Sequence, residues 1–413
     1  MVGLLQSRSG ASGRQAARPS RRTAIGFMLG APLLSACASA QQSFSQFSKP
    51  FGAEAQPSAA APTGPAQPPS AAGNGQVKVG MILPLSASGN ASLAAASMKN
   101  AAEMSLAVFQ TANVQLLIKD DGGTPQGAQQ AAQQALDEGA QIILGPLFAG
   151  SVPATAQVAR TRNVPCIAFS TDSSVAGRGV YLLSFQPESD VNRIVDHAAS
   201  IGKRSFAALL PENAYGNVVE LAFKQAVGRR GGRIVAFEKY GGDRATPART
   251  IAQALGQADA LLLADDGEGV VAMADALTAA GANLRNVQLL GTGLWDNPRV
   301  FASAALQGGL YAAPDPAGFR GFSTKYRARF GSEPVRTATL AYDAVALTAA
   351  LAQTPGGGPH YTPAILTNSS GFAGIDGLFR FRPDGTNERG LAVMRVASGG
   401  GVPVAGSPKS FGA

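Results

Sequence analysis

Short runs of hydroxyl, acidic and glycine residues follow several apolar segments of this sequence, and these residue types suit the binding of a small molecule. The candidate ligand-binding residues are Ser86, Ser88, Asn90, Ala149, Gly150, Ser151, Ser170, Thr171, Asp172, Ser174, Tyr215, Asp265, Asp266, Trp295 and Asp296. Hydroxyl groups and the free N–H groups at helix starts can hold a carboxylate or similar anion without a charged side chain. We therefore expect Ser151, Ser170 and Ser174 to bind an anionic group. Tyr215 and Trp295 would stack against the ligand from a second lobe.

The alternative is that these side chains are structural. Serine, threonine, aspartate and glycine cap helices and turns in proteins of every function.

Residues for covalent or metal chemistry are scarce. The chain has two histidines and two cysteines, which cannot form a Cys₄ or Cys₂His₂ zinc site. A hydrolytic triad would have to use His197 or His360. No G-x-S-x-G or Walker sequence occurs, and no G-x-G-x-x-G follows the first predicted strand. Cys166 lies in an apolar run, which is typical of a core residue. We expect a protein that is not an enzyme and holds no metal or cofactor.

From residue 77 onwards, short apolar segments alternate with alanine-rich helical segments. The expected strands are residues 77–83, 114–118, 142–144, 164–169, 181–185, 205–210, 234–237, 260–263 and 287–290. The expected helices are residues 91–110, 126–138, 152–162, 189–201, 214–230, 247–255, 270–280, 319–330 and 335–353. Apolar strands spaced by helices predict parallel βαβ units with both faces covered. The fold class is therefore α/β, with two doubly wound parallel-sheet lobes.

We expect the following division of the chain into domains. Residues 76–186 and about 314–371 are assigned to a first lobe, and residues 187–313 and about 372–400 to a second. Antiparallel strands are expected near residues 378–382 and 391–396, and residues 401–413 form a tail. Because each lobe is discontinuous in sequence, the hinge between them must contain more than one crossing of the chain.

The N-terminal region predicts export and lipidation. Residues 1–36 contain five arginines and no acid, and residues 24–36 form an apolar stretch of 13 residues. That stretch is shorter than the roughly 20 residues that span a bilayer, but it suits a signal peptide. It ends in Leu34-Ser35-Ala36-Cys37, which resembles a bacterial lipobox, so Cys37 is the candidate lipidation site. Residues 37–75 then comprise this cysteine and an Ala/Pro/Ser-rich tether. Ala38 favours the outer membrane, and Ser20-Arg21-Arg22 leaves the twin-arginine route open.

The net charge of +8 is concentrated in this leader. Its five arginines leave a net charge of +3 on the other 377 residues. A nearly neutral mature chain gives no support for nucleic-acid binding.

Five segments resemble the type I periplasmic binding protein family, the group of Leu/Ile/Val-binding receptors. They are residues 79–86 (VGMILPLS), 118–125 (IKDDGGTP), 139–146 (GAQIILGP), 214–216 (AYG) and 377–381 (GLFRF) with the following Asp384-Gly385. The resemblance covers most of residues 77–400 and implies two lobes that close around a ligand at a hinge. Residues 120–149, together with the lipobox and tether, are most similar to proteobacterial lipoproteins that activate penicillin-binding proteins.

The resemblance implies two possible functions. The first is a lipid-anchored periplasmic receptor that binds a small polar or anionic, amino-acid-like solute, with an ABC permease as the partner that this role implies. The alternative is an outer-membrane lipoprotein that activates a peptidoglycan synthase. The amino-acid receptors bind the ligand ammonium with an acid and tyrosines, but Gly293 and Ser92 occupy two of those positions here. Ala149 likewise replaces a carboxylate-binding serine. Asp265, Asp266 or Asp296 are candidate substitutes for the acid, and the departure argues against a plain α-amino acid.

Overall fold

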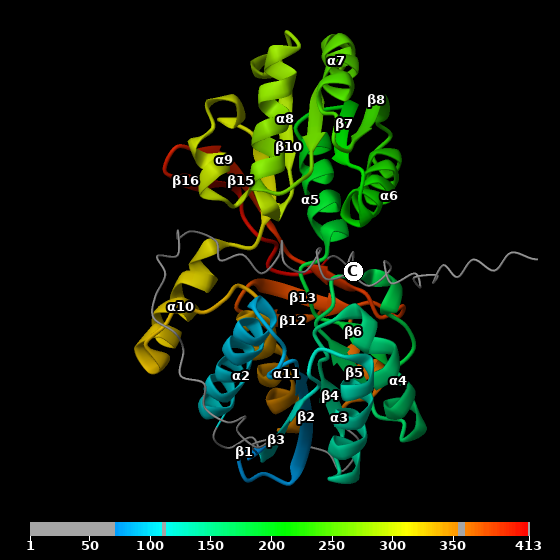
Figure 1. Ribbon diagram of the computed structural model, residues 1–413, viewed down its shortest axis with the longest axis vertical. Helices are drawn as coiled ribbons and strands as arrows, with labels where there is room; N and C mark the ends of the chain where they lie inside the picture. Colours follow the sequence, from blue (N-terminus) through cyan, green and yellow to red (C-terminus); the bar gives the residue numbers. More distant parts are fainter. Residues whose placement is uncertain (1–70, 110–112, 354–359, 412–413) are drawn as a thin grey trace, which may run out of the picture. The chain divides into compact units, whose positions relative to one another are not determined.

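The computed structural model describes residues 71–109, 113–353 and 360–411, so the predicted signal peptide, Cys37 and most of the tether lie outside the described residues. The predicted α/β architecture is confirmed. Strands form two large sheets, in which most neighbours are parallel, and one small antiparallel sheet (Figure 1). Separate hydrophobic clusters lie on the two faces of each large sheet, because helices cover both faces.

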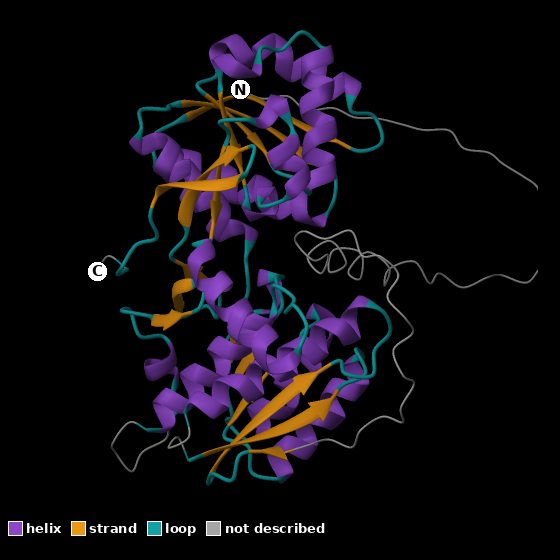
Figure 2. Cartoon of the chain, turned by 90° about the vertical axis from the view of Figure 1, so that its left-hand side faces the viewer, coloured by secondary structure: helices purple, strands orange, loops and turns teal. Residues whose placement is uncertain are grey.

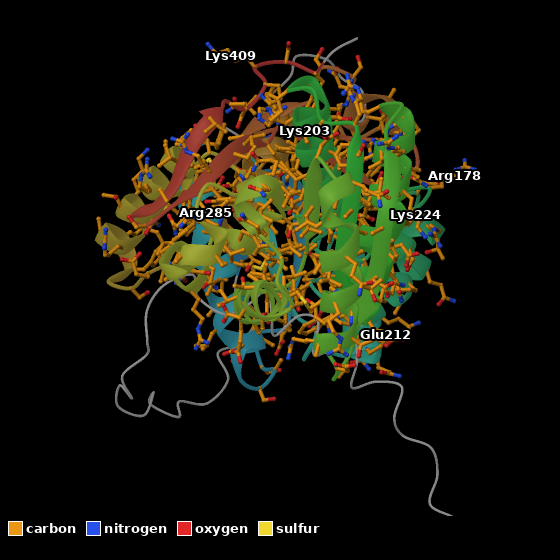
Figure 3. All side chains as sticks on the ribbon, turned by 90° about the horizontal axis from the view of Figure 1, so that it is seen from above. Arg178, Lys203, Glu212, Lys224, Arg285 and Lys409 are labelled. Carbon is orange, nitrogen blue, oxygen red and sulfur yellow. The ribbon has the colours of Figure 1, made fainter. Side chains whose placement is uncertain are left out.

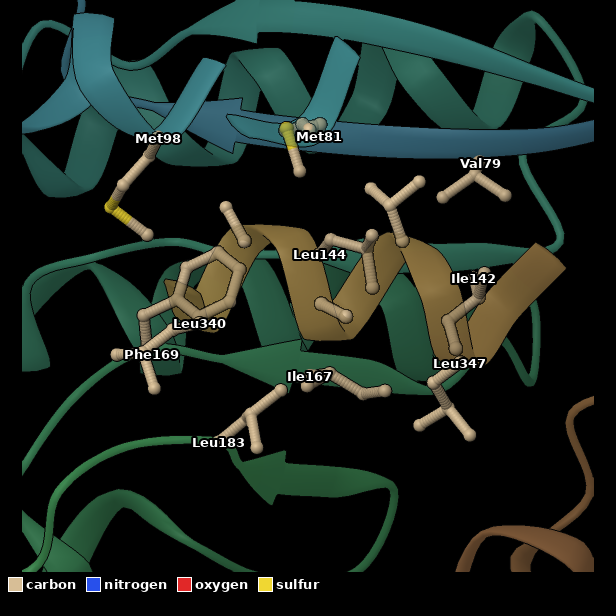
Figure 4. Packing of buried hydrophobic residues seen from close by; sticks show 14 of the residues in the cluster. Val79, Met81, Met98, Ile142, Leu144, Ile167, Phe169, Leu183, Leu340 and Leu347 are labelled. Carbon is tan, nitrogen blue, oxygen red and sulfur yellow. The ribbon is translucent and has the colours of Figure 1, made fainter. Parts of the chain in front are cut away.

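The first large sheet has the order β1-β3-β2-β4-β5-β6. Its strands are β1 (Ala71–Ala72), β2 (Val77–Leu83), β3 (Val114–Asp120), β4 (Ile142–Leu144), β5 (Cys166–Ala168) and β6 (Val180–Leu182). The helices associated with it are α2 (Asn90–Val108), α3 (Pro125–Asp137), α4 (Val152–Thr161), α10 (Pro316–Phe330), α11 (Ala338–Ala352) and α12 (Pro363–Leu366). Met81 of β2 and Leu144 of β4 pack with Leu340 of α11 in the core of this lobe (Figure 4). The helix that contributes Leu340 comes from the far end of the sequence, so the lobe is discontinuous.

The second large sheet has the order β16-β15-β11-β10-β9-β7-β8. Its strands are β7 (Ser205–Pro211), β8 (Arg233–Tyr240), β9 (Ala260–Leu263), β10 (Gln288–Gly291), β11 (Leu310–Ala313), β15 (Ala392–Ala397) and β16 (Gly400–Ala405). The helices associated with it are α5 (Pro187–Ser200), α6 (Ala214–Arg229), α7 (Ala245–Ala254), α8 (Gly267–Ala279) and α9 (Pro298–Ala302). Figure 2 shows helices and strands intermixed in both lobes. β15 and β16 are antiparallel, as expected for residues 391–396, and β16 continues into the segment expected to be a tail.

The small sheet contains β12 (Phe372–Gly374), β13 (Gly377–Phe381) and β14 (Asn387–Arg389). The sequence predicts that these residues belong to the second lobe. Phe379 and Phe381 instead pack in the core cluster of the first sheet, because alternate side chains of β13 point towards it.

Within the described residues, the chain passes between the two large sheets three times, after β6, after β11 and after β14. The first crossing is hydrogen-bonded to β14, the strand that directly precedes the third crossing. The Ser184 carbonyl accepts from Asn387 Nδ2 and from Arg389 Nε, each over 2.9 Å. This pairing gives the hinge a multi-strand structure, as the sequence predicted.

Charged side chains are distributed around the surface. Figure 3 shows Lys224, Arg285 and Glu212 on different parts of the second lobe, with both signs present. Within the described residues, no helix has the length and apolar character needed to cross a membrane.

Candidate ligand-binding site

The loops at the carboxyl ends of the strands meet at one switch point in each large sheet. In the first sheet β2 lies between β3 and β4, so the chain leaves β2 in one direction and returns on the other side. In the second sheet β7 lies between β8 and β9 in the same way. Ligands of open α/β sheets bind at such points, because the neighbouring loops diverge and leave a crevice. The predicted site residues follow the strands at and beside these points.

The loop after β2 keeps its polar side chains exposed. Ser86, Ser88 and Asn90 all face solvent. The Ser86 N–H donates to Asp120 Oδ1 over 3.1 Å, which ties this loop to the end of β3. Burial alone would raise the pKa of Asp120, but hydrogen bonds from Ser86 and from backbone N–H groups keep it below its usual range.

Among the described residues, Ser151 is one of several buried polar residues of the first lobe that have an unpaired side-chain atom, as do Asp121 and Thr155. It follows β4 and directly precedes α4, and its side chain is 1% exposed. Its Oγ has no hydrogen-bond partner within the described residues, and α4 has no side-chain cap. Ala149 and Gly150 beside it are partly and fully exposed. A buried hydroxyl without a partner is costly, so Ser151 Oγ would gain from a hydrogen bond to a ligand, and its binding role stays a prediction.

The loop after β5 uses its hydroxyl groups internally. Ser170 Oγ accepts from the Asp172 N–H over 3.0 Å. The Asp172 carboxylate accepts from the Ser174 N–H over 2.9 Å and from its hydroxyl over 2.6 Å. Thr171 is partly buried between them. These bonds fit the capping alternative for Ser170 and Ser174.

The second lobe has a pocket of about 330 Å³ at its switch point. Its wall includes Asp265, Asp266 and Arg244, together with Tyr240 from the end of β8. The Tyr240 hydroxyl donates to Asp265 Oδ2 over 2.5 Å. Burial raises the pKa of Asp265, and the Tyr240 bond opposes that rise. Asp266 accepts from the N–H groups of Glu268 and Gly269, so it caps α8.

Acids outnumber bases around this pocket. Glu212 and Glu268 also line it, which places four carboxyl groups beside the single guanidinium of Arg244. Such an imbalance favours a ligand group that carries positive charge.

Tyr215 lies at the start of α6, directly after the β7 loop, and is partly buried. Its hydroxyl forms a 2.8 Å hydrogen bond with Thr292 Oγ1 at the end of β10. Burial is the main reason that the pKa of Tyr215 is raised. Its hydroxyl therefore lies beside the carboxyl end of β10, and its stacking against a ligand stays a prediction.

The expectation for Trp295 is wrong. Its side chain is fully buried, and its indole N–H donates to the Leu263 carbonyl over 3.0 Å. The ring lies so close to Gly291 that a Cβ there would come within 2.1 Å of it. The turn after β10 thus directs Trp295 back into the core of the second lobe and away from any ligand. Asp296 is partly exposed and accepts from the Tyr311 hydroxyl over 3.2 Å.

One acid beside these loops was missed by the sequence analysis. Asp190 lies in the first turn of α5, and its Oδ2 accepts the Gly293 N–H over 2.9 Å. A carboxyl group is thus present next to position 293 although residue 293 itself is glycine. Burial raises the pKa of Asp190 to about 7, and no cation lies within hydrogen-bond distance of it among the described residues. Local sequence gave no signal, because acids in the first turn of a helix are common.

A larger hollow of about 1420 Å³ lies elsewhere in the second lobe. It is lined by residues such as Val287 and Gly308, which precede β10 and β11, so it is at the amino ends of these strands. Ligands of such sheets bind at the carboxyl ends, so we do not assign it to the site. Within the described residues, no group of three or more His, Cys, Asp or Glu side chains could hold a metal ion.

Comparisons with known proteins agree with this architecture. The sequence model of a family described as periplasmic binding protein matches residues 76–401. A putative branched-chain amino acid ABC transporter from Rhodospirillum rubrum has a similar structure, with a TM-score of 0.71 and 20% identity, over 79% of this chain and 99% of that one. A solute-binding protein of Rhodopseudomonas palustris BisB5, solved with 3,4-dihydroxy benzoic acid, has a TM-score of 0.56 and 20% identity over 81% of this chain and 97% of that one. At these identities the likeness shows the fold.

Curated relatives match a shorter stretch. The penicillin-binding protein activator LpoA of Enterobacter sp. (strain 638) is 28% identical over 142 residues, which is 34% of this chain and 19% of the relative. The protein of that name from Serratia proteamaculans (strain 568) is 27% identical over 132 residues, or 32% of this chain and 19% of the relative. The match therefore spans about a fifth of the length of these relatives.

Proposed function

The chain belongs to the periplasmic binding protein family, and on this basis we propose that it is a receptor for a small, amino-acid-like solute that it delivers to an ABC permease. Members of this family are solute-binding proteins and generally not enzymes, and membership implies a periplasmic location. The solute and the permease are the parts that we propose.

The observation that carries the proposal is the pairing of opposite chemistries at the two switch points. The first lobe offers Ser151, a buried hydroxyl that has no hydrogen-bond partner in the described part of the chain, at the start of α4, which has no side-chain cap. Helix starts favour anionic groups. The second lobe offers Asp265 and, beside Gly293, Asp190, which favour a cationic group. A ligand with one carboxylate and one ammonium group would satisfy both halves.

The location of the protein is proposed from its N-terminal sequence. We propose that Cys37 carries lipid and that the anchored chain faces the periplasm, on the outer membrane rather than the inner. Cys37→Ser should move the protein from the membrane fraction to the soluble periplasmic fraction. Unchanged fractionation would exclude lipidation at Cys37.

Thermal-shift screening of the purified chain against amino acids, aromatic acids and muropeptides tests the receptor function. A ligand at 100 times its Kd stabilises the folded state by about 2.7 kcal/mol, which is a readily measured shift. Ser151→Ala and Asp265→Asn should each reduce the shift. Asp275→Asn is the matched control, because it makes the same change on an exposed residue of α8 outside the pocket. Equal shifts in all three variants would exclude the proposed site.

The second candidate is activation of a peptidoglycan synthase, which the similarity to the activator LpoA favours. In that case the protein surface binds a penicillin-binding protein and no amino acid stabilises the chain. A flat thermal-shift screen combined with co-purification of a transpeptidase would replace the receptor proposal with this one.

A further inference from the structure

The segment formed by residues 406–411 leaves the second sheet after β16 and returns to the small sheet. Its first contact is with α5 of the second lobe, where Arg193 Nη2 donates to the Gly406 carbonyl over 3.2 Å. The same guanidinium donates through Nε to the Leu391 carbonyl over 2.8 Å, at the third crossing of the chain. Arg193 therefore holds this segment against the hinge.

Two glycines of the first lobe and hinge make room for the segment. A Cβ on Gly390 would lie 3.0 Å from Pro408 Cγ, and a Cβ on Gly371 would lie 2.8 Å from Phe411 Cε2. Gly371 also has a φ of 70°, which side-chain-bearing residues rarely adopt. Because Gly390 and Gly371 have no side chains, Pro408 and Phe411 can pack directly against the backbone at these two positions.

A cation–π contact connects Phe411, at the C-terminal end of this segment, to the small sheet. Arg380 Cζ lies 4.6 Å from the centre of the Phe411 ring, and Arg380 also forms a 2.9 Å ion pair with Glu388. Arg380 is on β13 and Glu388 on β14, so Phe411 contacts β13 directly and is connected to β14 through Arg380. That sheet shares its core with the first lobe through Phe379 and Phe381.

We propose that residues 406–411 form a strap that joins the second lobe to the small sheet across the hinge and restricts the rotation of one lobe against the other. The three covalent crossings define an axis for this rotation. The strap adds a non-covalent connection whose two ends are fixed to different lobes. Its bonds are few and its middle residues, Pro408, Lys409 and Ser410, are exposed, so it can detach without disturbing either core. The strap is a property of the hinge and does not depend on which ligand the protein binds.

Pulsed electron-spin resonance between spin labels on the two lobes tests the strap. Gln157 of α4 and Gln225 of α6 are exposed and belong to different lobes, so Gln157→Cys and Gln225→Cys provide the label sites. The full chain carries Cys37→Ser, and Cys166 is fully buried and therefore unreactive to the label. Without ligand, the parent chain should give one narrow distance distribution. Phe411→Ala should add a second population or broaden the distribution.

Two further variants separate a strap from a general packing role. Phe411→Tyr keeps the ring that contacts Gly371 and Arg380, so it should retain the narrow distribution. Lys409→Ala changes an exposed residue of the same segment and should have no effect. A melting temperature measured for each variant confirms that it is folded. If Phe411→Ala leaves the distance distribution unchanged in a folded protein, the strap does not restrict the hinge and the proposal is wrong.

Discussion

The Asp190 carboxylate accepts the backbone N–H of Gly293, although the two residues are 103 positions apart in the sequence. The bond joins the first turn of α5 to the end of β10 and fixes a carboxyl group at the strand exits of the second lobe. A Cβ on residue 293 would lie 3.2 Å from Asp190 Oδ2, so glycine at this position lets the carboxylate approach. The contact between α5 and the loop after β10 thus places an acid beside residue 293, which the sequence of neither segment indicates alone.

Asp190 should make the stability of the chain depend on pH. Its pKa is about 7 in the folded protein against a usual value of 3.8, because burial disfavours the charged form. Between these values the folded state holds a proton that the unfolded chain has lost, so the free energy of unfolding falls as pH rises from about 4 to 7. Asp190→Asn removes this dependence and should stabilise the protein at pH 8 by roughly 2 kcal/mol, allowing for partial exposure to solvent. Urea denaturation at pH 4, 6 and 8 measures it.

Other carboxyl groups also have a raised pKa, such as those of Asp121 and Asp343. Comparing the variant with the parent chain at each pH separates the contribution of Asp190 from theirs. Asp275→Asn serves as the control and should track the parent chain. A stability difference between Asp190→Asn and the parent that is the same at all three values of pH would contradict the assignment.

The ion pair between Arg336 and Asp376 should be important for folding. Asp376 is fully buried, and both its oxygens accept from Arg336, over 2.8 and 2.5 Å. Burial alone would raise the pKa of Asp376, but the Arg336 guanidinium keeps it below its usual range. Arg336→Met leaves a buried charge without its partner, so it should cost about 3–5 kcal/mol in the free energy of unfolding.

Arg327→Met is the matched control for that change. Arg327 and Glu333 form an exposed pair, whose loss should cost about 1 kcal/mol or less. Both variants are compared by chemical denaturation at neutral pH. Equal costs for the two substitutions would mean that burial does not strengthen the Arg336 pair.

The sequence predicted most of the parallel strands well because they are continuous apolar runs buried on both faces. β8, at the edge of its sheet, is mostly only partly buried. Residues 142–144 and 260–263 are strands with those same bounds. β11 and β16 are absent from the predicted elements for a physical reason. β11 is four residues long between Gly309 and Pro314, and β16 contains two glycines and a proline. Pairing with β10 and β15 stabilises them, and a single segment does not reveal its partners.

The candidate site was harder to predict than the fold. A position after a strand was enough to locate Asp265 and Ser151 near the switch points. It was not enough for Trp295, because the direction of a side chain depends on the turn that follows the strand. The sequence alone could not identify Asp190 as a candidate site residue, because its position depends on a contact with a loop that is distant in the sequence.

Tyr240 should affect stability mainly through Asp265. Its hydroxyl donates to a carboxylate, and hydrogen bonds to charged groups contribute about 1.5–3 kcal/mol. Tyr240→Phe should therefore destabilise the second lobe by about 2 kcal/mol. The loss also removes the bond that lowers the pKa of Asp265, so the cost should grow as pH rises. Tyr361→Phe is the control, because Tyr361 donates to a neutral carbonyl, that of Thr348, and should cost about 1 kcal/mol. Chemical denaturation at pH 5 and 8 measures the free energy of unfolding of both variants. A loss of stability in Tyr240→Phe that is the same at both values of pH would contradict the coupling to Asp265.

The single tryptophan should report on the core of the second lobe and not on the ligand. Trp295 is fully buried and its N–H is bonded to Leu263, so its fluorescence emission should be blue-shifted in the folded protein and move to the red on unfolding. Because the ring is shielded from the strand exits, a ligand that raises the melting temperature should leave the emission maximum unchanged. Trp295→Phe should cost about 2 kcal/mol, since it leaves a cavity and an unpaired Leu263 carbonyl. A ligand-induced shift in the emission maximum would show that the turn after β10 rearranges and exposes Trp295 when the site is filled.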